Sequence, residues 1–205
     1  MKSSFDLDNQ NSIIDSRIVA ALERISEAFR VLLWNESKTF SLSPIQIQIL
    51  IFLYTHSEEK RKVSYLAEEF NLTKPTISDA VKTLEEKSLI RKKTNSADSR
   101  SHCIGLTKKG KEIAEKTSLF TTELEKPIAQ LNPDDKGNLL LSLINIIHHL
   151  TNARVITIQR MCLNCIYYRK DENQQQHFCA LLNKRLKVSD LRIDCPEHSL
   201  AESYL

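Results

Sequence analysis

The 205-residue chain carries 29 Lys and Arg against 26 Asp and Glu, a net charge of +3, and 41% of its residues are apolar. This length and apolar content suffice for one or two domains with a hydrophobic core and exclude a disordered chain. Because only three glycines and five prolines are present, the composition favours helices over a sandwich or barrel, which need many tight turns. The first twelve residues are polar and no uncharged apolar run reaches membrane-spanning length, so we expect a cytoplasmic protein without a signal peptide or membrane span.

Two helices are predicted in the first quarter of the chain. Apolar residues recur every three or four positions over residues 14–32 and predict a long amphipathic helix. Ser43 is a suitable N-cap for a short apolar helix that continues to about residue 53, with Pro44 in its first turn. The alternating apolar residues at the start of this second segment are also typical of a strand, so the strand remains an alternative.

Two shorter helices follow a charged connector at residues 57–62. Ser64 can cap the first of them, which ends near Asn71. Thr73 then caps an amphipathic helix at residues 74–87. Two short helices joined by so brief a turn predict a helix-turn-helix.

The next segment predicts a hairpin and a long helix. Residues 89–106 contain two apolar ends around a basic and polar middle, which indicates two strands with a long polar tip. Thr107 can cap the helix that follows, and we expect Pro127 to kink or end it.

The last predicted helix is opened by Asn132 and Pro133 and is apolar on most sides between residues 139 and 150. Such a surface needs a cover beyond the helix itself, and a partner subunit is the simplest one. We therefore expect a homodimer. The alternative is that this helix is buried within its own chain.

Local motifs support this order of elements. The helix-turn-helix motif comprises Leu66, Ala67, Leu72, Thr76, Ile77, Ser78, Val81, Leu84, Glu85, Leu89, Ile90 and Arg91, and the wing motif comprises Asp98, Arg100, Leu106, Thr107 and Gly110. Over residues 10–155 these features resemble the MarR family of winged-helix regulators. The resemblance implies a mainly α fold with a small β-hairpin wing, a non-enzymatic transcriptional regulator and a homodimer that binds a palindromic operator in double-stranded DNA. The sequence departs from the family pattern at Ser88, where the family usually has glycine at the end of the helix.

Charge and polar side chains indicate where DNA would bind. Residues 60–112 carry thirteen basic against seven acidic residues, a net charge of +6, which suits a polyanionic partner. In the second helix of the helix-turn-helix, the expected groove and phosphate contacts are Thr73, Lys74, Thr76, Ser78, Asp79 and Lys82. Arg100 suits a narrow minor groove, and Asp98 is expected to orient Arg100 or a neighbouring arginine. The alternative for the helix residues is an ordinary solvated face.

A second unit is expected at residues 157–205, after a winged-helix and dimerisation domain at residues 1–156. This segment holds Cys162, Cys165, Cys179 and Cys195 but too few apolar residues for a core of its own. Four cysteines in a cytosolic protein bind metal more often than they form disulfides. We expect a metal-stapled module in which the four thiolates hold a structural zinc ion.

Alternatives to zinc and to gene regulation remain open at this stage. One close cysteine pair followed by two single cysteines is similar to the pattern of high-potential iron-sulfur proteins, so the alternative cofactor is an iron-sulfur cluster. The alternative function is electron transfer on a helical scaffold. His177 and His198 lie near two of the cysteines but histidines in such positions are usually bystanders, and Cys103 is expected to be a packed strand residue rather than a redox switch. The signal to which the regulator responds is expected to be a small-molecule ligand, a metal or a redox change.

Overall fold

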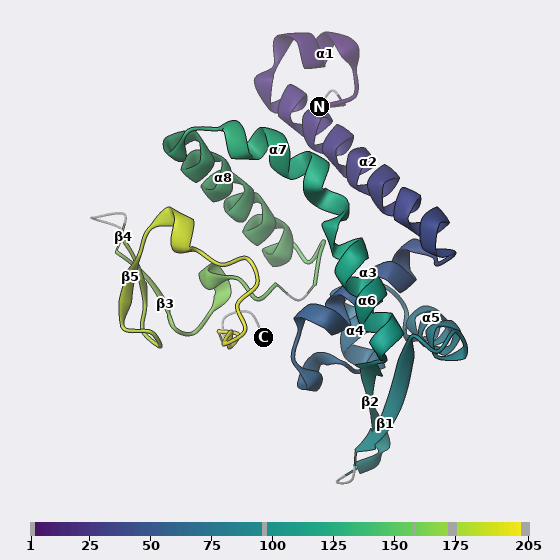
Figure 1. Cartoon of the computed structure of the whole chain (residues 1–205). Coiled ribbons are helices and arrows are strands. Elements are labelled where there is room, and N and C mark those ends of the chain that lie inside the picture. Colours follow the sequence, from purple (N-terminus) through teal and green to yellow (C-terminus); the bar gives the residue numbers. More distant parts are fainter. Residues whose placement is uncertain (1–2, 96–97, 158, 172–175, 202–205) are drawn as a thin grey trace.

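The computed structural model describes residues 3–95, 98–157, 159–171 and 176–201, and for residues 93–95 and 98–102, in the wing, only the backbone is described. The chain is mainly helical, with two small antiparallel sheets (Figure 1). The helices are α1 (Leu7–Ser12), α2 (Ile14–Phe40), α3 (Pro44–Thr55), α4 (Val63–Glu69), α5 (Lys74–Glu86), α6 (Lys108–Thr117), α7 (Thr122–Gln130) and α8 (Pro133–Asn152). The strands are β1 (Ile90–Asn95), β2 (Asp98–Leu106), β3 (Tyr168–Asp171), β4 (Gln176–Cys179) and β5 (Lys184–Leu186). Among the described residues, no helix is long and apolar enough to cross a membrane.

Helix α3 is the centre of the winged-helix core. Ser43 and Gln46 form a capping box, in which the Ser43 hydroxyl accepts from the Gln46 N–H at 3.4 Å and the Gln46 side chain accepts from the Ser43 N–H at 2.9 Å. This cap explains why the segment is a helix rather than the alternative strand. Four α3 side chains are fully buried, and the core continues into α4, α5 and the wing; these α3 residues are Ile47, Ile49, Leu50 and Leu53.

The helix-turn-helix is formed by α4 and α5. Helix α4 starts at Val63 with Lys62 at its N-cap, so the prediction that Ser64 caps it is wrong by two residues. The extended backbone of Lys62 marks the start, and Ser64 lies inside the first turn. Thr73 caps α5 as predicted, because its hydroxyl accepts from the Thr76 N–H at 3.3 Å.

The turn after α5 keeps its shape without glycine. Ser88 adopts a left-handed backbone with φ of 58°, which costs a non-glycine residue about 1 kcal/mol or more. The N–H of Leu89 donates to the Leu84 carbonyl at 2.9 Å, and the N–H of Ser88 donates to Glu85 at 2.8 Å. These bonds close the helix and compensate for the strain at Ser88.

The Leu-Thr-x-x-Gly motif at the end of the hairpin packs against the turn that contains Ser88. Strands β1 and β2 pair antiparallel, with Ile90 opposite Leu106. The Thr107 hydroxyl accepts from the Gly110 N–H at 3.1 Å and lies 2.9 Å from the Ser88 carbonyl oxygen. A Cβ atom on Gly110 would lie 1.9 Å from the Leu89 carbonyl oxygen. Only glycine allows α6 to start so close to the backbone of this turn.

The long helix predicted after Thr107 is interrupted earlier than expected. It breaks in a 3₁₀ segment at Ser118–Thr121, whereas Pro127 lies inside α7. The Thr117 hydroxyl donates to the Ile113 carbonyl at 2.8 Å and the Ser118 hydroxyl to Glu115 at 2.7 Å. Side chains that bind the helix carbonyls in this way favour a break.

The C-terminal module packs beside α8 (Figure 1). Its sheet has the order β3-β4-β5. Ile144 of α8 is fully buried against Met161 and Leu191, which belong to the same chain. On this face of α8 the cover therefore comes from the same chain, which was the alternative, and the homodimer stays a prediction for the rest of the helix.

Candidate DNA-binding surface and cysteine module

Helix α5 presents its polar side to solvent. Ile77, Ala80, Val81 and Leu84 are buried in the winged-helix core, so the opposite side of the helix faces outward. All six predicted contact residues of this segment are exposed: Thr73, Lys74, Thr76, Ser78, Asp79 and Lys82.

The threonines at the start of α5 also have a structural role. The hydroxyl oxygens of Thr73 and Thr76 lie 2.8 Å apart, in addition to the capping bond between these two residues. Their hydroxyl groups are therefore already oriented when a ligand approaches. Ser78, Asp79 and Lys82 follow on the exposed side of the helix.

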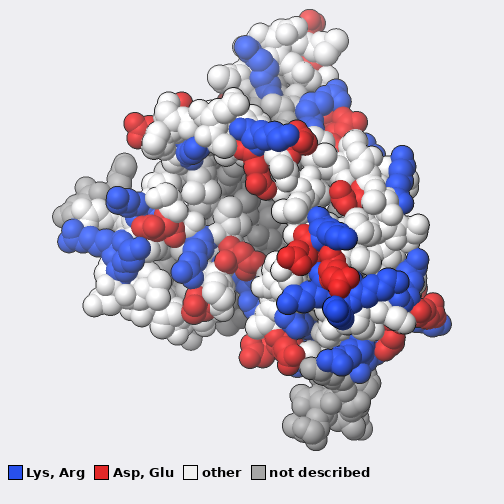
Figure 2. Space-filling model, viewed as in Figure 1, with Lys and Arg blue, Asp and Glu red and all other residues white. Residues whose placement is uncertain are grey.

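The wing adds a basic strand beside α5. Lys92 of β1 forms an ion pair of 2.7 Å with Glu85 of α5, and Arg91 is exposed. Asp98 and Arg100 lie in β2, but their side chains fall outside the described part of the chain. Figure 2 shows that Lys and Arg are spread over this face of the molecule with Asp and Glu among them, rather than gathered in one continuous basic patch.

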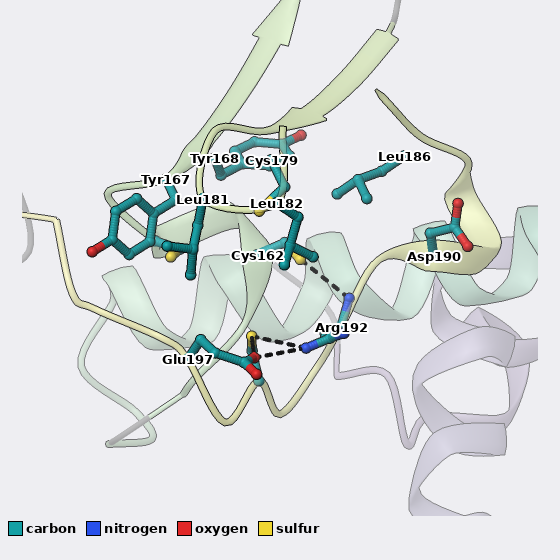
Figure 3. Close-up of a pocket in the computed structure, with 12 residues that line it drawn as sticks. Cys162, Tyr167, Tyr168, Cys179, Leu181, Leu182, Leu186, Asp190, Arg192 and Glu197 are labelled. Carbon is teal, nitrogen blue, oxygen red and sulfur yellow. Dashed lines mark hydrogen bonds and ion pairs between the residues drawn. The ribbon is translucent and has the colours of Figure 1, made fainter. Parts of the chain in front are cut away.

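The four predicted metal ligands line one cavity of about 40 Å³. Cys162 is the first residue of a short 3₁₀ turn and Cys165 follows its end, Cys179 ends β4, and Cys195 lies in the C-terminal segment. Figure 3 shows Cys162 and Cys179 pointing into this space, with Leu182 beside them. The fold thus brings together cysteines that are up to 33 positions apart in the sequence.

Arg192 donates to two of these sulfur atoms. Its backbone N–H lies 3.2 Å from the sulfur of Cys162, and its guanidinium lies 3.4 Å from that of Cys195. Burial raises the pKa of the Cys162 thiol, the backbone N–H of Arg192 lowers it, and the neighbouring cysteines raise it further. The cluster therefore concentrates negative charge when its thiols ionise, which favours a bound cation.

The other cysteine and the two nearby histidines do not line this cavity. His177 is buried and its Nδ1 lies 2.6 Å from the Tyr168 hydroxyl, while His198 Nε2 lies 2.9 Å from the Asn164 side-chain oxygen. Cys103 lies in the wing strand, where its thiol donates to the Glu58 carbonyl at 3.3 Å. These hydrogen bonds are consistent with structural positions for all three residues.

Arg160 connects the cysteine module to the helix-turn-helix, a feature that the sequence analysis missed. Its side chain is 7% exposed and lies between Glu69 of α4 and Asp194 of the module. The guanidinium donates to Glu69 at 2.6 and 3.2 Å, to Asp194 at 2.6 and 2.9 Å, and to the Tyr65 hydroxyl at 2.9 Å. No periodic pattern marks a single arginine of this kind, so the sequence gives no signal for it.

The same network fixes the position of Asp194. Its second carboxylate oxygen accepts from His56 at 2.8 Å. Burial alone would raise the pKa of Asp194, but the hydrogen bonds from His56 and Arg160 outweigh it and hold the pKa well below its ordinary value. The carboxylate is therefore ionised at neutral pH and balances the buried guanidinium.

Backbone contacts strengthen this connection. The N–H of Cys195 donates to the Arg160 carbonyl at 2.8 Å, and that of Cys162 donates to the Arg192 carbonyl at 3.0 Å. On the other side, the Thr157 hydroxyl lies 2.5 Å from the Glu68 carbonyl and 2.7 Å from the side-chain oxygen of Asn71, in the turn between α4 and α5. Cys162 is thus two residues from Arg160, which contacts the helix-turn-helix, and Cys195 is next to Asp194, which pairs with Arg160.

Comparison with known proteins gives matches in the winged-helix region. Residues 40–101 match the MarR family. No curated protein sequence matches the chain. Among solved structures, a DNA complex of Staphylococcus aureus MepR is 25% identical, with a TM-score of 0.57, and the likeness covers 64% of this chain and 97% of that one.

Two further MepR structures have a similar fold. MepR in a DNA-binding conformation is 24% identical with a TM-score of 0.57, and the likeness covers 65% of this chain and 98% of that one. MepR described as a transcription regulator of the S. aureus multidrug efflux pump MepA is 24% identical with a TM-score of 0.50, covering 63% and 96%. These likenesses span nearly all of MepR and leave about a third of this chain unmatched. The segment that matches the MarR family, the capped α5 and the hairpin wing agree with one another, and the chain has the winged-helix fold of these structures.

Proposed function

We propose that the protein is a sequence-specific DNA-binding transcriptional regulator, a repressor, whose affinity for DNA depends on the state of its cysteine module. The observation that carries the DNA-binding part is the exposed polar face of α5, which is held on a buried apolar face and flanked by the wing. A solved structure of the similar protein MepR is a complex with DNA, which supports the same activity here.

The first turn of α5 suits a phosphate or a base edge. Its N–H groups point outward at the positive end of the helix dipole, and Lys74 adds a positive charge there. Ser78 and Lys82 lie one and two turns further on, where a recognition helix contacts bases and the adjacent backbone. Arg100 would then enter the neighbouring minor groove.

Substitutions on these elements test the DNA contacts. Arg100→Ala and Lys82→Ala should each weaken binding by about 1–3 kcal/mol if they make specific groove contacts, and loss of a phosphate contact should lower the salt slope by about one. The probe is a duplex selected from a random-sequence pool by the full-length protein, and the measurement is the dissociation constant at several salt concentrations. Lys116→Ala, an exposed lysine in the last turn of α6, is the matched control. Unchanged affinity and salt slope for both variants would contradict the proposed surface.

Two helices present apolar stripes that suit a homodimer. On α8 the face opposite Ile144 carries Leu139, Leu143, Ile146 and Leu150, of which Leu139 and Ile146 are about 40% exposed. On α2 exposed apolar residues include Ile18, Ile25 and Phe29. The spacing of four and three residues on α8 is that of a helix seam that packs against another helix. A dimer would place two copies of α5 for a palindromic operator.

The dimer is tested on the exposed stripe rather than at Ile144. Ile146→Glu should shift the protein from dimer toward monomer in sedimentation at micromolar concentration, because it puts a charge into an apolar interface. Val155→Glu, an exposed apolar residue beyond the end of α8, should leave the dimer intact. A wild-type monomer that binds the selected duplex tightly would contradict the proposed dimer.

The response to a signal is proposed to run from the cysteine module to α4 through Arg160. A metal bound by Cys162, Cys165, Cys179 and Cys195 would stabilise the loops that carry Arg160 and Asp194, since small modules of this kind fold with their metal. Arg160 contacts Glu69 of α4 directly, and Asp194 pairs with the other side of the same guanidinium. Loss of the metal would release this contact and change the position of the helix-turn-helix.

A charge-removing substitution in α4 tests the coupling. In the wild type, removing the metal with a chelator should change the affinity for the selected duplex by about 5- to 150-fold, the usual range of coupling between two sites. In Glu69→Gln this change should shrink, because half of the anionic contact to Arg160 is lost, and the free energy of unfolding should fall by about 2 kcal/mol. Glu68→Gln, the exposed neighbour, should behave like the wild type. An equal metal response in Glu69→Gln and wild type would contradict this route.

A further inference from the structure

The spacing of the four cysteines bears on what they hold. A single zinc ion binds four thiolates at about 2.3 Å in a tetrahedron, which brings the sulfur atoms within about 4 Å of one another. All four cysteines are described, yet among the described residues no three side chains of the types His, Cys, Asp and Glu are close enough to hold one ion. The cysteines nevertheless line the same cavity. The four cysteines therefore surround one space, but their sulfur atoms are not close enough together to bind a single ion.

The size of this space is informative. The cavity measures about 40 Å³, whereas one water molecule needs about 10–15 Å³ on the same measure. The cavity lies among twelve side chains and is wider than the space that four sulfur atoms around one zinc ion would enclose, because those atoms nearly touch. A cubane iron-sulfur cluster is larger, since each thiolate binds a different iron atom at a separate corner. The thiolates of a cluster therefore stand much farther apart than those of a zinc site.

The positions of the four cysteines in the chain also suit an iron-sulfur cluster. Structural zinc sites commonly take their ligands as two close pairs. Here one pair, Cys162 and Cys165, comes from a turn, whereas Cys179 ends a strand and Cys195 lies in a separate segment. Three separate segments thus supply the four thiols around the cavity, an arrangement that can serve the separate corners of a cluster.

The walls of the cavity suit a cluster as well. Apart from the cysteines, five of its lining residues are apolar or aromatic and three are charged: Tyr167, Tyr168, Leu181, Leu182 and Leu186, with Asp190, Arg192 and Glu197. Arg192 provides a backbone N–H to Cys162 and a positive guanidinium to Cys195. An apolar shell limits access of water, and N–H donors to sulfur stabilise the negative charge of a thiolate-bound cluster.

We propose that Cys162, Cys165, Cys179 and Cys195 each bind one iron of a cubane iron-sulfur cluster, in place of the zinc ion that the sequence favours. This inference rests on the proposed function only in that both require the module to bind a metal. Zinc, a cluster and an empty site differ in composition and colour, so the choice among them is separable from DNA binding.

The test is metal analysis of full-length protein purified without air, with its visible spectrum. We expect about four iron and four acid-labile sulfide per chain and a brown colour that bleaches on exposure to air. Cys179→Ser and Cys195→Ser should lose most of this iron, whereas Cys103→Ser, in the wing, should retain it. If the purified protein is empty, ferric iron, sulfide and a thiol reductant added without air should restore the colour in the wild type and in Cys103→Ser.

Two results would overturn the cluster. One is a colourless protein that holds one zinc per chain and takes up no iron and sulfide on reconstitution. The other is a protein that holds neither metal and stays colourless after reconstitution. Binding of the selected duplex, measured on the same preparation, reports separately on the proposed regulator, because a chain with zinc can still bind DNA specifically.

Discussion

The structure depends on one buried charge, the guanidinium of Arg160. A charge so far removed from water is tolerated only when it is paired and its hydrogen bonds are satisfied. Glu69 and Asp194 do this from opposite sides, one from the helix-turn-helix and the other from the segment that leads into Cys195. An arrangement that separated the two units would break the ion pair between Arg160 and Glu69. The unit that is expected to bind DNA and the unit that is expected to hold a metal are therefore joined by an electrostatic requirement.

Helix α8 shows how the C-terminal module is accommodated on a winged-helix fold. One of its faces buries Ile144 against Met161 and Leu191 of the same chain, while the other leaves Leu139 and Ile146 exposed. The same helix can thus serve the module and a partner subunit without conflict. A structural change in the cysteine module would therefore affect α4 through the contacts of Arg160. It would also affect a dimer interface through the contacts of α8.

Much of the winged helix could be predicted because its signals are local. The cap at Thr73 and the apolar face of α5 each depend on residues close together in the sequence. Gly110 of the wing motif is required by one close contact with the backbone of Leu89. A shared site for the four cysteines was predicted because cysteines in a protein expected in the cytosol bind metal more often than they form disulfides. The fold brings all four to one cavity. The cover of α8 and the Arg160 network were not predictable, because both depend on contacts between residues far apart in the sequence. The break at Ser118 was missed because hydroxyl-to-carbonyl bonds there outweigh the better-known effect of Pro127.

The central claim is that the cysteine module and the helix-turn-helix form one energetic unit through Arg160. Amide hydrogen exchange of full-length protein, measured before and after removal of the metal from the module, tests this most directly. The account predicts that exchange accelerates in α4 as well as around the cysteines, while amides of α3, buried in the winged-helix core, keep their protection. Acceleration confined to residues 157–201, with α4 unchanged, would contradict it.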